Sequence, residues 1–415
     1  MRLLYFAAHQ MFPLTSGNRL RDYHLSRQLV RRASVTFVET CHEGEQPSSQ
    51  SADSSYDSIV SLSKPTGYKL GNILRGLVGP TPIPVLNYFE PQSENLLANV
   101  LADRRFDTLQ IEGIHLSRYL RVINTAAPRP RILADWHNIE SELMWRYSEH
   151  TPSWSKRLVA KRTARLLEKA ELQLLNKCDA HTVVSEREKR KLLALCPSAN
   201  VHVVPNGVDT EHFASSGLAA NPLGSNSENS GHNLIYVGSM DYHANIDAVV
   251  WFARDVWPEI AKRHPKLKFV IVGRNPSEQI RRLESESIRV TGTVADVRPF
   301  YASAFAVVVP LRVGGGTRLK ILEAMAAGVP VVTTHLGAEG ISAEDRVHAL
   351  FADTPREIID AVDQLYRSAQ LRQCLADGGK NLVAECYDWA ALGENLYRLH
   401  ASLLASKSQN QAGLN

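Results

Sequence analysis

The sequence predicts an α/β protein made of two doubly wound domains. Its 415 residues are enough for two separate hydrophobic cores. Short apolar strand-like segments alternate with helical segments along almost the whole chain. A stretch rich in Ser, Asn and Gly, Ala214–Asn233, divides this alternation into two halves of similar size. The alternative is one larger α/β domain with a disordered insertion.

The first half, residues 1–213, opens with an apolar strand at Arg2–Ala8, a Gly-containing loop and the helical segment NRLRDYHLSRQLVRR. VTFVE is expected to be the second strand. Further strands are predicted at Ser58–Leu62, Thr108–Glu112, Ile132–Asp135, His181–Val184 and Val201–Val204. Most are short, apolar and bounded by polar loops, as buried parallel strands are.

Residues 214–232 are expected to form a linker or mobile loop, and residues 233–388 a second α/β series. Its predicted order is NLIYVG, a helix over Asn245–Arg263, KFVIVG, a short helix, IRVTGTV, AFAVVVPL, a helix and PVVTT, with helices near Pro355–Leu375 and Trp389–Ala405 at the end. Ligands of doubly wound sheets bind beyond the carboxyl ends of the strands, so the cleft between the halves is the expected site.

Composition narrows the function classes. Apolar residues make up 44% and charged residues 22%, as in ordinary globular proteins, and the net charge of +4 is too small to indicate nucleic acid. Five scattered cysteines without a Cys-x-x-Cys pair favour a reducing cytosol over a disulfide framework or structural zinc. The opening MRLLYFAAHQ is expected to be a strand, not a signal peptide, and no apolar run is long enough to span a membrane.

The segment VGGGTRLKILEAMAAGVPVVTT, Val313–Thr334, carries the clearest functional pattern. It follows the strand AFAVVVPL, and its helix is expected to begin near Gly316. A helix N-terminus has unpaired N–H groups and a partial positive charge, which suit an anion. Gly314–Gly316 carry no β-carbon, so a phosphate can approach the backbone. Arg318 and Lys320 add cations, which indicates a ligand with more negative charge than backbone alone can meet.

Glu323 lies seven residues beyond Gly316, on the same helix face and about 10 Å along the axis. Helical side chains lean toward the N-terminus, so this carboxylate could accept hydrogen bonds from ribose hydroxyls near a bound diphosphate. The alternative is a Gly-rich turn followed by an Arg–Glu or Lys–Glu helix pair worth about 0.2–0.5 kcal/mol. Spacing alone does not decide between the two.

The segment GGGTRLKILEAMAAGVPVVTT resembles the donor-site signature of the retaining glycosyltransferases of family 4, which have the GT-B fold. Further segments resemble the same family: VPNGVD, YVGSMDYHANIDAVVWF, VIVGR and VTGTVADVRPFYASA, and in the first half ADWHNIES and DAHTVVSE. The resemblance covers nearly the whole chain. It implies two Rossmann-like domains facing across a cleft, an acceptor-side domain over 1–213 and a nucleotide-sugar donor domain over 233–388, with helix 389–405 packing back on the first.

The resemblance also implies roles for individual residues. Glu323 would bind ribose, while the glycines, Arg318 and Lys320 would hold the diphosphate and stabilise the charge that develops as it leaves. The catalytic candidates are His137, Arg318 and Lys320, and the donor-binding candidates are Gly17, Gly238, Arg274, Val294, Gly314, Gly315, Gly316, Thr317 and Glu323. In the implied front-face mechanism the leaving phosphate helps to deprotonate the acceptor, so neither a protein nucleophile nor a cofactor is required.

The sequence departs from the family pattern at two places. Gly315 stands where the family usually has a Glu that contacts the donor sugar, eight residues before Glu323. The segment after VGSM lacks the Lys that many members direct at the diphosphate, and Arg318, Lys320 or Arg274 would take its place. The glycine run resembles that of a known subgroup, so the first departure bears on donor-sugar choice.

His137 follows the strand RILAD at a carboxyl end. Taken alone, such a histidine is more often structural, but the resemblance implies contact with the donor sugar and the reacting centre. The acceptor-side candidates are Glu112, His115 and Asn138. No Asp-x-Asp occurs and no His/Cys cluster has metal spacing, so no metal is expected.

Other function classes are disfavoured or stay open. The glycines of a dinucleotide fingerprint and of a P-loop are absent, which disfavours an NAD dehydrogenase and a P-loop kinase. A nucleotide-sugar epimerase or a phosphorylase of the same fold would turn over donor without acceptor or need free phosphate. A non-catalytic GT-B subunit would bind nucleotide without transfer.

A basic helix is expected over Ser153–Glu171, where Arg157, Lys161, Arg165 and Lys169 recur every four residues. It is either a solvated face of the first domain or a contact with anionic lipid. The expected partners are therefore a nucleotide-sugar donor, a glycan, lipid-linked or small-molecule acceptor, and a membrane surface, but no nucleic acid. The expected location is the cytoplasm, with the inner face of the membrane as the alternative.

Overall fold

The structure is a computed structural model. It describes the chain except residues 15, 43–44, 46–47, 49–54, 68, 215–231, 315–317 and 413–415, and it describes side chains as far as residue 405. The predicted linker and three of the predicted donor-site residues, Gly315, Gly316 and Thr317, therefore lie outside the described residues.

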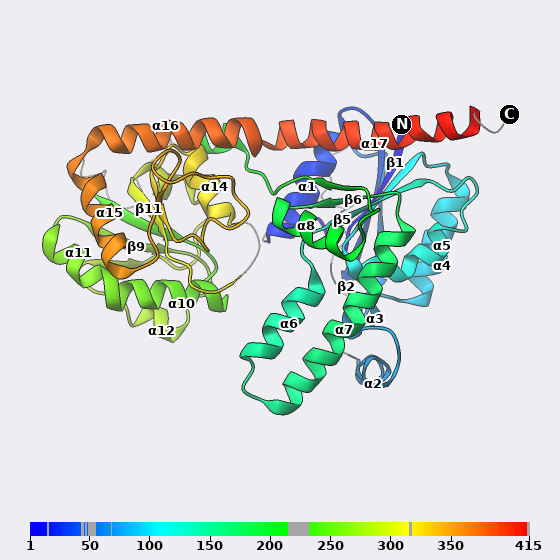
Figure 1. The fold of residues 1–415 in the computed structure, drawn as a ribbon, viewed down its shortest axis with the longest axis horizontal. Coiled ribbons are helices and arrows are strands. Elements are labelled where there is room, and N and C mark those ends of the chain that lie inside the picture. The colour runs from blue at the N-terminus through cyan, green and yellow to red at the C-terminus, as the bar shows by residue number, and fades with distance from the viewer. Residues whose placement is uncertain are drawn as a thin grey trace. The chain divides into compact units, whose positions relative to one another are not determined.

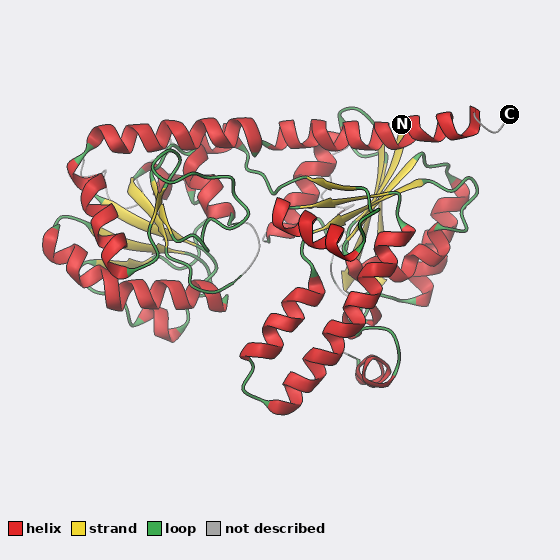
Figure 2. Ribbon diagram, in the orientation of Figure 1, coloured by secondary structure: helices red, strands yellow, loops and turns green. Residues whose placement is uncertain are grey.

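The chain forms two compact units, Met1–Pro205 with Leu392–Asn415, and Asn206–Ala391. Each has its own hydrophobic core and its own parallel sheet flanked by helices (Figure 2). The division after Pro205 comes a few residues before the boundary expected from the sequence. Among the described residues, no helix is long and apolar enough to cross a membrane.

The amino-terminal unit contains a seven-stranded sheet in the order β3-β2-β1-β4-β5-β6-β7 (Figure 1). Its strands are β1 Arg2–Phe6, β2 Ser34–His42, β3 Ser58–Lys64, β4 Thr108–Glu112, β5 Arg131–Trp136, β6 Ala180–Val183 and β7 Val201–Val203. Its helices are α1 Gly17–Val30, α2 Leu70–Val78, α3 Ile83–Leu86, α4 Pro91–Asp103, the 3-10 helix η2 Ile114–Tyr119, α5 Leu120–Ile123, α6 Glu140–His150, α7 Trp154–Lys177 and α8 Glu186–Leu195. All pairings are parallel, as the continuous apolar strands predict.

The carboxyl-terminal unit contains a six-stranded parallel sheet in the order β10-β9-β8-β11-β12-β13. Its strands are β8 Asn233–Val237, β9 Lys268–Val272, β10 Ile288–Val290, β11 Ala304–Val309, β12 Val331–Thr333 and β13 Leu350–Phe351. Its helices are α9 Thr210–Ala214, α10 His243–Trp251, the π-helical turn η5 Phe252–Val256, α11 Trp257–Arg263, α12 Glu278–Arg281, α13 Arg298–Ala302, α14 Leu319–Ala326, α15 Pro355–Arg367 and α16 Ala369–Cys386.

Three helices differ from the sequence prediction. The helix expected over Asn245–Arg263 is interrupted by η5, next to Pro258, which has no N–H to donate into a regular α-helix. The helix expected over Pro355–Leu375 is two helices, α15 and α16, because Ser368 ends the first and caps the second. The helix α14 begins at Leu319, with Arg318 in a non-helical conformation, and not near Gly316.

The last helix, α17 Trp389–Ala412, begins in the carboxyl-terminal unit and continues in the amino-terminal unit from Leu392. In the latter it packs closely on α1, since a β-carbon at Gly393 would lie only 2.1 Å from the Cβ atom of Gln28. His400 of α17 is fully buried, with Nε2 3.1 Å from Oε1 of Gln110 on β4. The amino-terminal unit therefore includes a packed segment from the far end of the chain.

In both sheets the strand order reverses beside one central pair, β1 and β4 in the first and β8 and β11 in the second. Connections leave such a pair toward opposite sides, which opens a crevice at the carboxyl ends of its strands. The residues that follow these four strands are therefore the first place to look for a functional site in each unit.

Candidate functional site

In the carboxyl-terminal unit, two loops approach each other at the switch point. Gly238 follows β8 and Gly273 follows β9. A β-carbon at Gly273 would lie 1.7 Å from the carbonyl oxygen of Gly238, so the two backbones touch in a way that only glycine permits. Arg274 joins the same loops, because its Nε donates to Ser239 Oγ at 2.8 Å and its carbonyl accepts from Met240 N at 2.9 Å.

Gly238 also makes room for Lys320. A β-carbon there would lie 2.7 Å from Lys320 Nζ. The Lys320 ammonium donates to Tyr236 Oη and Asn245 Oδ1, both at 2.9 Å, and stands 4.1 Å from the centre of the Tyr236 ring. The cation predicted from the sequence is thus held on β8 and α10, although it comes from α14.

Burial and the neighbouring charge of Arg318 lower the pKa of Lys320 to about 7, against an opposing contribution from Glu323. Arg318 is itself buried, at 7% exposure, and its Nη2 atom lies 3.2 Å from the position of a β-carbon on Gly314. Gly314 has φ of +113°, a conformation that favours glycine. Arg318, Lys320 and Gly314 therefore gather near the start of α14.

Glu323 lies one turn into α14, closer to the helix start than the sequence prediction placed it. Tyr301 of α13 donates its hydroxyl to Glu323 Oε2 at 2.8 Å. Burial raises the pKa of Glu323, while the Tyr301 hydrogen bond and the charge of Lys320 act in the opposite direction. The carboxylate is thus oriented by a tyrosine that the sequence analysis did not single out.

The remaining described donor-site candidates, Val294 and Gly17, lie in loops or at a helix start. Val294, in the loop after β10, is half-buried against the core of its unit. Gly17 is the first residue of α1 in the amino-terminal unit and is exposed. Within the described part of the chain, neither makes a side-chain polar contact that would assign it a ligand.

In the amino-terminal unit, His137 joins a buried acidic cluster at the ends of β4 and β5. Its Nε2 atom is in close contact with Glu112 Oε2, and lies 3.5 Å from Asp22 Oδ1 and 3.6 Å from Asp135 Oδ2. Burial by itself lowers the pKa of His137, but the carboxylates, Glu112 foremost, raise it well above the ordinary value. His137 is therefore a cation that neutralises surrounding carboxylates.

The acidic side chains of the cluster are in different states. Asp135 receives two hydrogen bonds at 2.9 Å from the buried Arg21 guanidinium and a third at 2.6 Å from Thr182 Oγ1. Burial would raise the pKa of Asp135, but the charges and hydrogen bonds of Arg21 and His137 together outweigh burial and lower it. Burial and the charge of Glu112 raise the pKa of Asp22, which favours its protonated form.

Asp22, Glu112 and His137 each present one ligand-type atom, and these atoms lie within 4.8 Å of one another. No metal-ligand spacing is visible in the sequence because Asp22 belongs to α1, far along the chain from Glu112 and His137. The group could hold a cation only if His137 and Asp22 lost their protons, so the raised pKa values of these two residues oppose metal binding.

The other acceptor-side candidates lie around this cluster. Burial and the charge of His137 lower the pKa of His115 to about 4, and its ring lies 4.7 Å from that of Tyr88. His9, which the sequence analysis missed, meets the same tyrosine and has a pKa of about 3 for the same reason of burial. Asn138 is half-buried next to His137 without a polar contact of its own among the described residues.

Comparison with known proteins agrees with this architecture. A family model described as Glycosyltransferase Family 4 matches residues 23–212, and one described as Glycosyl transferases group 1 matches residues 231–368. The phosphatidyl-myo-inositol mannosyltransferase of Mycobacterium leprae is 28% identical over 216 residues, which are 50% of this chain and 55% of that protein. The chain thus spans about half the length of the curated relatives it matches.

Two solved structures show the fold. Sucrose-phosphate synthase from Thermosynechococcus elongatus has a TM-score of 0.68 at 15% identity, covering 98% of this chain and 100% of that one. An E. coli structure described as trehalose-6-phosphate bound with UDP-2-fluoro glucose has a TM-score of 0.68 at 14% identity, covering 97% and 99%. With two Rossmann-like sheets and family models over both halves, the chain belongs to the GT-B glycosyltransferases, with a Glycosyltransferase Family 4 amino-terminal half and a group 1 carboxyl-terminal half.

Proposed function

We propose that the protein is a retaining, metal-independent glycosyltransferase that moves a sugar from a nucleotide-sugar donor to an acceptor. The observation that carries the proposal is the pair Lys320 and Glu323 at the switch point of the second sheet, a cation beside a glycine and a carboxylate held by a tyrosine. Assembly of a polysaccharide or other glycoconjugate is the proposed setting. The mannosyltransferase names of the mycobacterial relatives support a lipid-linked acceptor.

In this proposal the donor binds to the carboxyl-terminal unit. Arg318, Lys320 and the N-terminus of α14 hold the diphosphate, with the backbone of residues 314–317 close to it. Gly238 supports this role because it leaves the Lys320 ammonium uncovered by a β-carbon. Glu323 accepts hydrogen bonds from the ribose, while Arg274 and Val294 flank the site.

His137 of the amino-terminal unit acts on the transferred sugar. The carboxylates around it keep it protonated, so it can donate a hydrogen bond to a sugar oxygen. Glu112, His115 and Asn138 are the acceptor-side residues. Retention follows from a front-face reaction, in which the leaving phosphate oxygen accepts the acceptor proton and no protein nucleophile is used.

We also propose that the protein is cytoplasmic and contacts the inner face of the membrane peripherally through α7. Arg157, Lys161, Arg165 and Lys169 recur along this helix, and bilayers that contain anionic lipid attract such segments by about 1 kcal/mol per cation.

The experiment that tests the transferase proposal has two steps. A thermal-shift screen of nucleoside diphosphate sugars identifies the donor, since a ligand at 100 times its Kd stabilises the folded state by about 2.7 kcal/mol. Transfer to candidate acceptors is then measured with and without EDTA, and the anomeric configuration of the product is determined by NMR. We expect retention of configuration and transfer that survives EDTA.

Other outcomes would contradict the proposal in different ways. An inverted product would exclude retention, and loss of transfer in EDTA with recovery on adding Mn²⁺ would exclude metal independence. Donor turnover without acceptor would indicate an epimerase or, with free phosphate, a phosphorylase. Binding without any turnover would indicate a non-catalytic subunit.

Glu323→Gln should weaken donor binding by roughly 1.5–3 kcal/mol, or about tenfold to more than a hundredfold, because a charged acceptor of ribose hydrogen bonds is lost. The melting temperature should change little, since the amide oxygen still accepts the Tyr301 hydroxyl. Tyr301→Phe is the matched control: it removes the orienting hydroxyl but keeps the carboxylate, so its effect should be smaller. Unchanged donor affinity in Glu323→Gln would remove this residue from the site.

Nucleoside diphosphate affinity should fall as the pH rises above about 7. The Lys320 pKa is about 7 in the free protein, and a bound diphosphate favours the protonated amine, so binding takes up a proton at higher pH. The Kd measured by calorimetry should therefore rise by up to about tenfold per pH unit. Lys320→Gln should bind more weakly and without this dependence. The same slope in both proteins would assign the titration to another group.

His137→Ala should leave nucleoside diphosphate affinity nearly intact but lower the transfer rate by about 10²-fold or more. Stability should also fall at neutral pH, because the raised pKa means that the protonated ring stabilises the folded state until the pH passes that value. Turnover must therefore be expressed per folded molecule.

The control for this variant is His181→Gln. His181 is buried on β6, where Nδ1 accepts from Trp136 at 3.2 Å and Nε2 lies 3.1 Å from the Leu175 carbonyl oxygen. Its loss should lower the melting temperature without lowering turnover per folded molecule. If His137→Ala behaves in the same way, His137 is structural.

A further inference from the structure

Lys64 is a buried cation at the carboxyl edge of the first sheet, and it has no carboxylate partner in the described part of the chain. It is the last residue of β3 and is 6% exposed. Its Nζ atom donates to the Ala8 carbonyl at 3.0 Å and stands 4.7 Å from the centre of the Tyr88 ring. Burial of an ammonium without a counter-charge costs free energy, so packing alone does not account for this residue.

Tyr88 brings two histidines to the same place. Its ring lies 5.9 Å from that of His9, which follows β1, and 4.7 Å from that of His115, which follows β4. The sheet order is β3-β2-β1-β4, so the carboxyl ends of these strands lie along one edge. Neither imidazole makes a hydrogen bond with a described residue. Three nitrogen-bearing side chains from the ends of three strands therefore surround one tyrosine.

The charges that act on this group are mainly positive. Burial lowers the pKa of His9 to about 3, and the neighbouring cations, Lys64 foremost, act in the same direction. Burial and the charge of Arg19 lower the pKa of Lys64 to about 8, against an opposing contribution from Glu45. At pH 7 the imidazoles of His9 and His115 are thus neutral, while the Lys64 amine is mostly protonated. The group offers one cation and two rings that can each donate one N–H.

The nearby carboxylates have other partners. Glu45 is exposed, and its Oε2 atom accepts from the His42 backbone N–H at 2.8 Å. The buried carboxylates at the ends of β4 and β5 surround His137 and Arg21. The Lys64 charge is therefore left for a ligand to neutralise.

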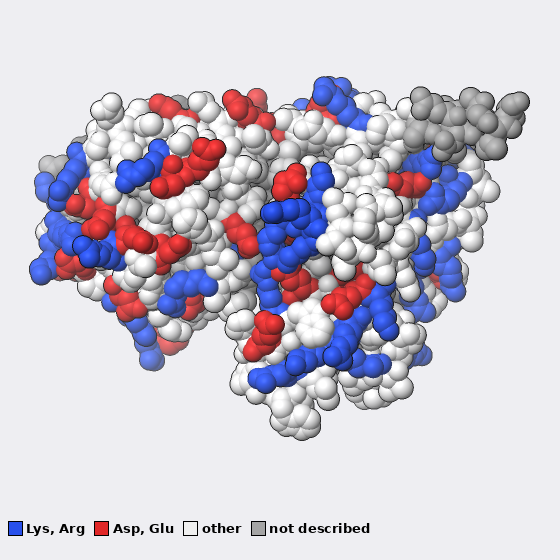
Figure 3. Space-filling view, in the orientation of Figure 1, with Lys and Arg blue, Asp and Glu red and all other residues white. Residues whose placement is uncertain are grey.

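Exposed cations do not mark a site in the same way. Figure 3 shows Lys and Arg side chains over much of one face of the molecule, interspersed with Asp and Glu. Water solvates such charges, and ion pairs between them contribute little to stability. A cation that is removed from water and unpaired, as Lys64 is, carries an electrostatic cost that an anionic ligand would offset.

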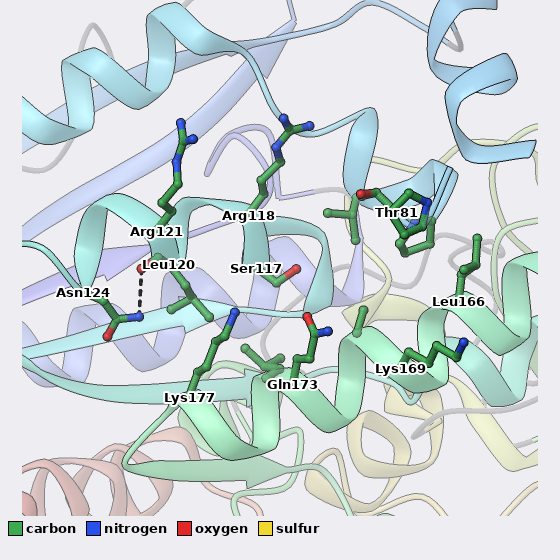
Figure 4. Close-up of a pocket in the computed structure, with 15 residues that line it drawn as sticks. Thr81, Ser117, Arg118, Leu120, Arg121, Asn124, Leu166, Lys169, Gln173 and Lys177 are labelled. Carbon is green, nitrogen blue, oxygen red and sulfur yellow. Dashed lines mark hydrogen bonds between the residues drawn. The ribbon is translucent and has the colours of Figure 1, made fainter. Parts of the chain in front are cut away.

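A pocket of about 540 Å³ between α7 and the η2–α5 segment illustrates the contrast (Figure 4). Its cations are Arg118, Arg121, Lys169 and Lys177, and all four are exposed. Arg121 is already in an ion pair. None of these side chains has lost its hydration as Lys64 has, so the pocket does not require an anion.

We infer that Lys64, His9 and His115 form a subsite for a negatively charged group, a phosphate or a carboxylate, that the acceptor carries close to its accepting hydroxyl. The charge of His137 acts on both His9 and His115, so the subsite adjoins the histidine assigned above to the transferred sugar. The Lys64 ammonium supplies the charge, and the two neutral rings supply N–H donors. The inference rests on the proposed transferase function and adds the charge of its acceptor.

The test is a titration of the full chain with inorganic phosphate, followed by NMR of the histidine ring nitrogens and their protons. The variants His9→Gln and His115→Gln assign the two signals of interest. Both signals should shift with millimolar phosphate but not with chloride at the same ionic strength. The exposed His335 of the carboxyl-terminal unit is an internal control whose signal should stay in place.

Sodium acetate is the second probe and separates the two kinds of anion. A response to phosphate but not to acetate assigns the subsite to a phosphate. The reverse response assigns it to a carboxylate.

Lys64→Met removes the charge and keeps most of the side-chain volume. The melting temperature should stay the same or rise, because an apolar side chain replaces a buried unpaired charge. The phosphate affinity reported by His9 and His115 should fall by about tenfold or more. The matched control is Lys262→Met, at an exposed position of α11, which should respond to phosphate like the native protein.

If Lys64→Met melts early, Lys64→Gln keeps the comparison valid, because its amide can still donate to the Ala8 carbonyl. A lower melting temperature with an unchanged phosphate response in both variants would make Lys64 structural and overturn the inference. In transfer assays, the same variants should raise the KM for the acceptor by about tenfold. The affinity for nucleoside diphosphate, which binds the other unit in the proposed function, should not change.

The remaining outcomes separate this inference from the proposed function. Transfer to an acceptor that carries no anionic group, without a phosphate response at His9 or His115, would overturn the inference and leave the transferase standing. A Lys64-dependent phosphate response in a protein that transfers no sugar would confirm an anion subsite and contradict the proposed function. A shift of His243 alone would place the phosphate at α10 in the carboxyl-terminal unit and overturn the inference.

Discussion

A fully buried ion pair between Arg21 and Asp135 determines the geometry of the amino-terminal unit at its carboxyl edge. Arg21 joins α1 to β5, donates to the Pro205 carbonyl at the end of the unit at 2.9 Å, and shares Asp135 with Thr182 of β6. Removing one partner of such a pair leaves an uncompensated buried charge and costs about 3–5 kcal/mol. His137 follows Asp135 by two residues, and with Asp135 held on β5 its ring lies against Glu112 and Asp22.

The carboxyl-terminal unit positions its polar groups differently. It uses glycines at the strand ends where the amino-terminal unit uses an ion pair. Gly238 and Gly273 let two strand-end loops touch, and the space above Gly238 is filled by the ammonium of Lys320. Tyr236 and Asn245 then fix that ammonium from below, although neither is charged. The space at Gly238 therefore lets two uncharged hydrogen-bond acceptors position this cation without an ion pair.

Several residues of the two clusters could be predicted from the sequence, because the ends of apolar strands can be recognised in it. Glu112, His137 and Gly238 follow apolar runs, and parallel strands bring their carboxyl ends to one edge. It could not show Arg21 or Asp22, whose helix mixes polar and apolar residues without a clear apolar face and so does not reveal that both are buried. The start of α14 was placed too early because glycines before a helix give no local signal of where the turn ends. Tyr301 was missed because a tyrosine in a short helix is more often core than partner of a carboxylate.

The two clusters differ in their charge balance, and this difference suits them to different tasks. In the amino-terminal unit two cations, Arg21 and His137, meet three carboxylates, and protonation of Asp22 brings the group to neutrality. The carboxylates around His137 favour its protonated form, although His137 Nε2, Glu112 Oε2 and Asp22 Oδ1 make no hydrogen bond with any described residue. In the carboxyl-terminal unit the charges that act on Lys320 are the Arg318 cation and the Glu323 carboxylate, and burial together with the Arg318 charge lowers the pKa of Lys320 to about 7. A lowered amine pKa measures how poorly its charge is stabilised in the free protein. Under the proposed function, a diphosphate would supply negative charge beside Lys320 and favour the protonated amine, so part of the binding energy would come from this interaction. A charge-balanced cluster in one unit and a pair of cations in the other fit the roles proposed for them, orientation of a sugar and binding of an anionic leaving group.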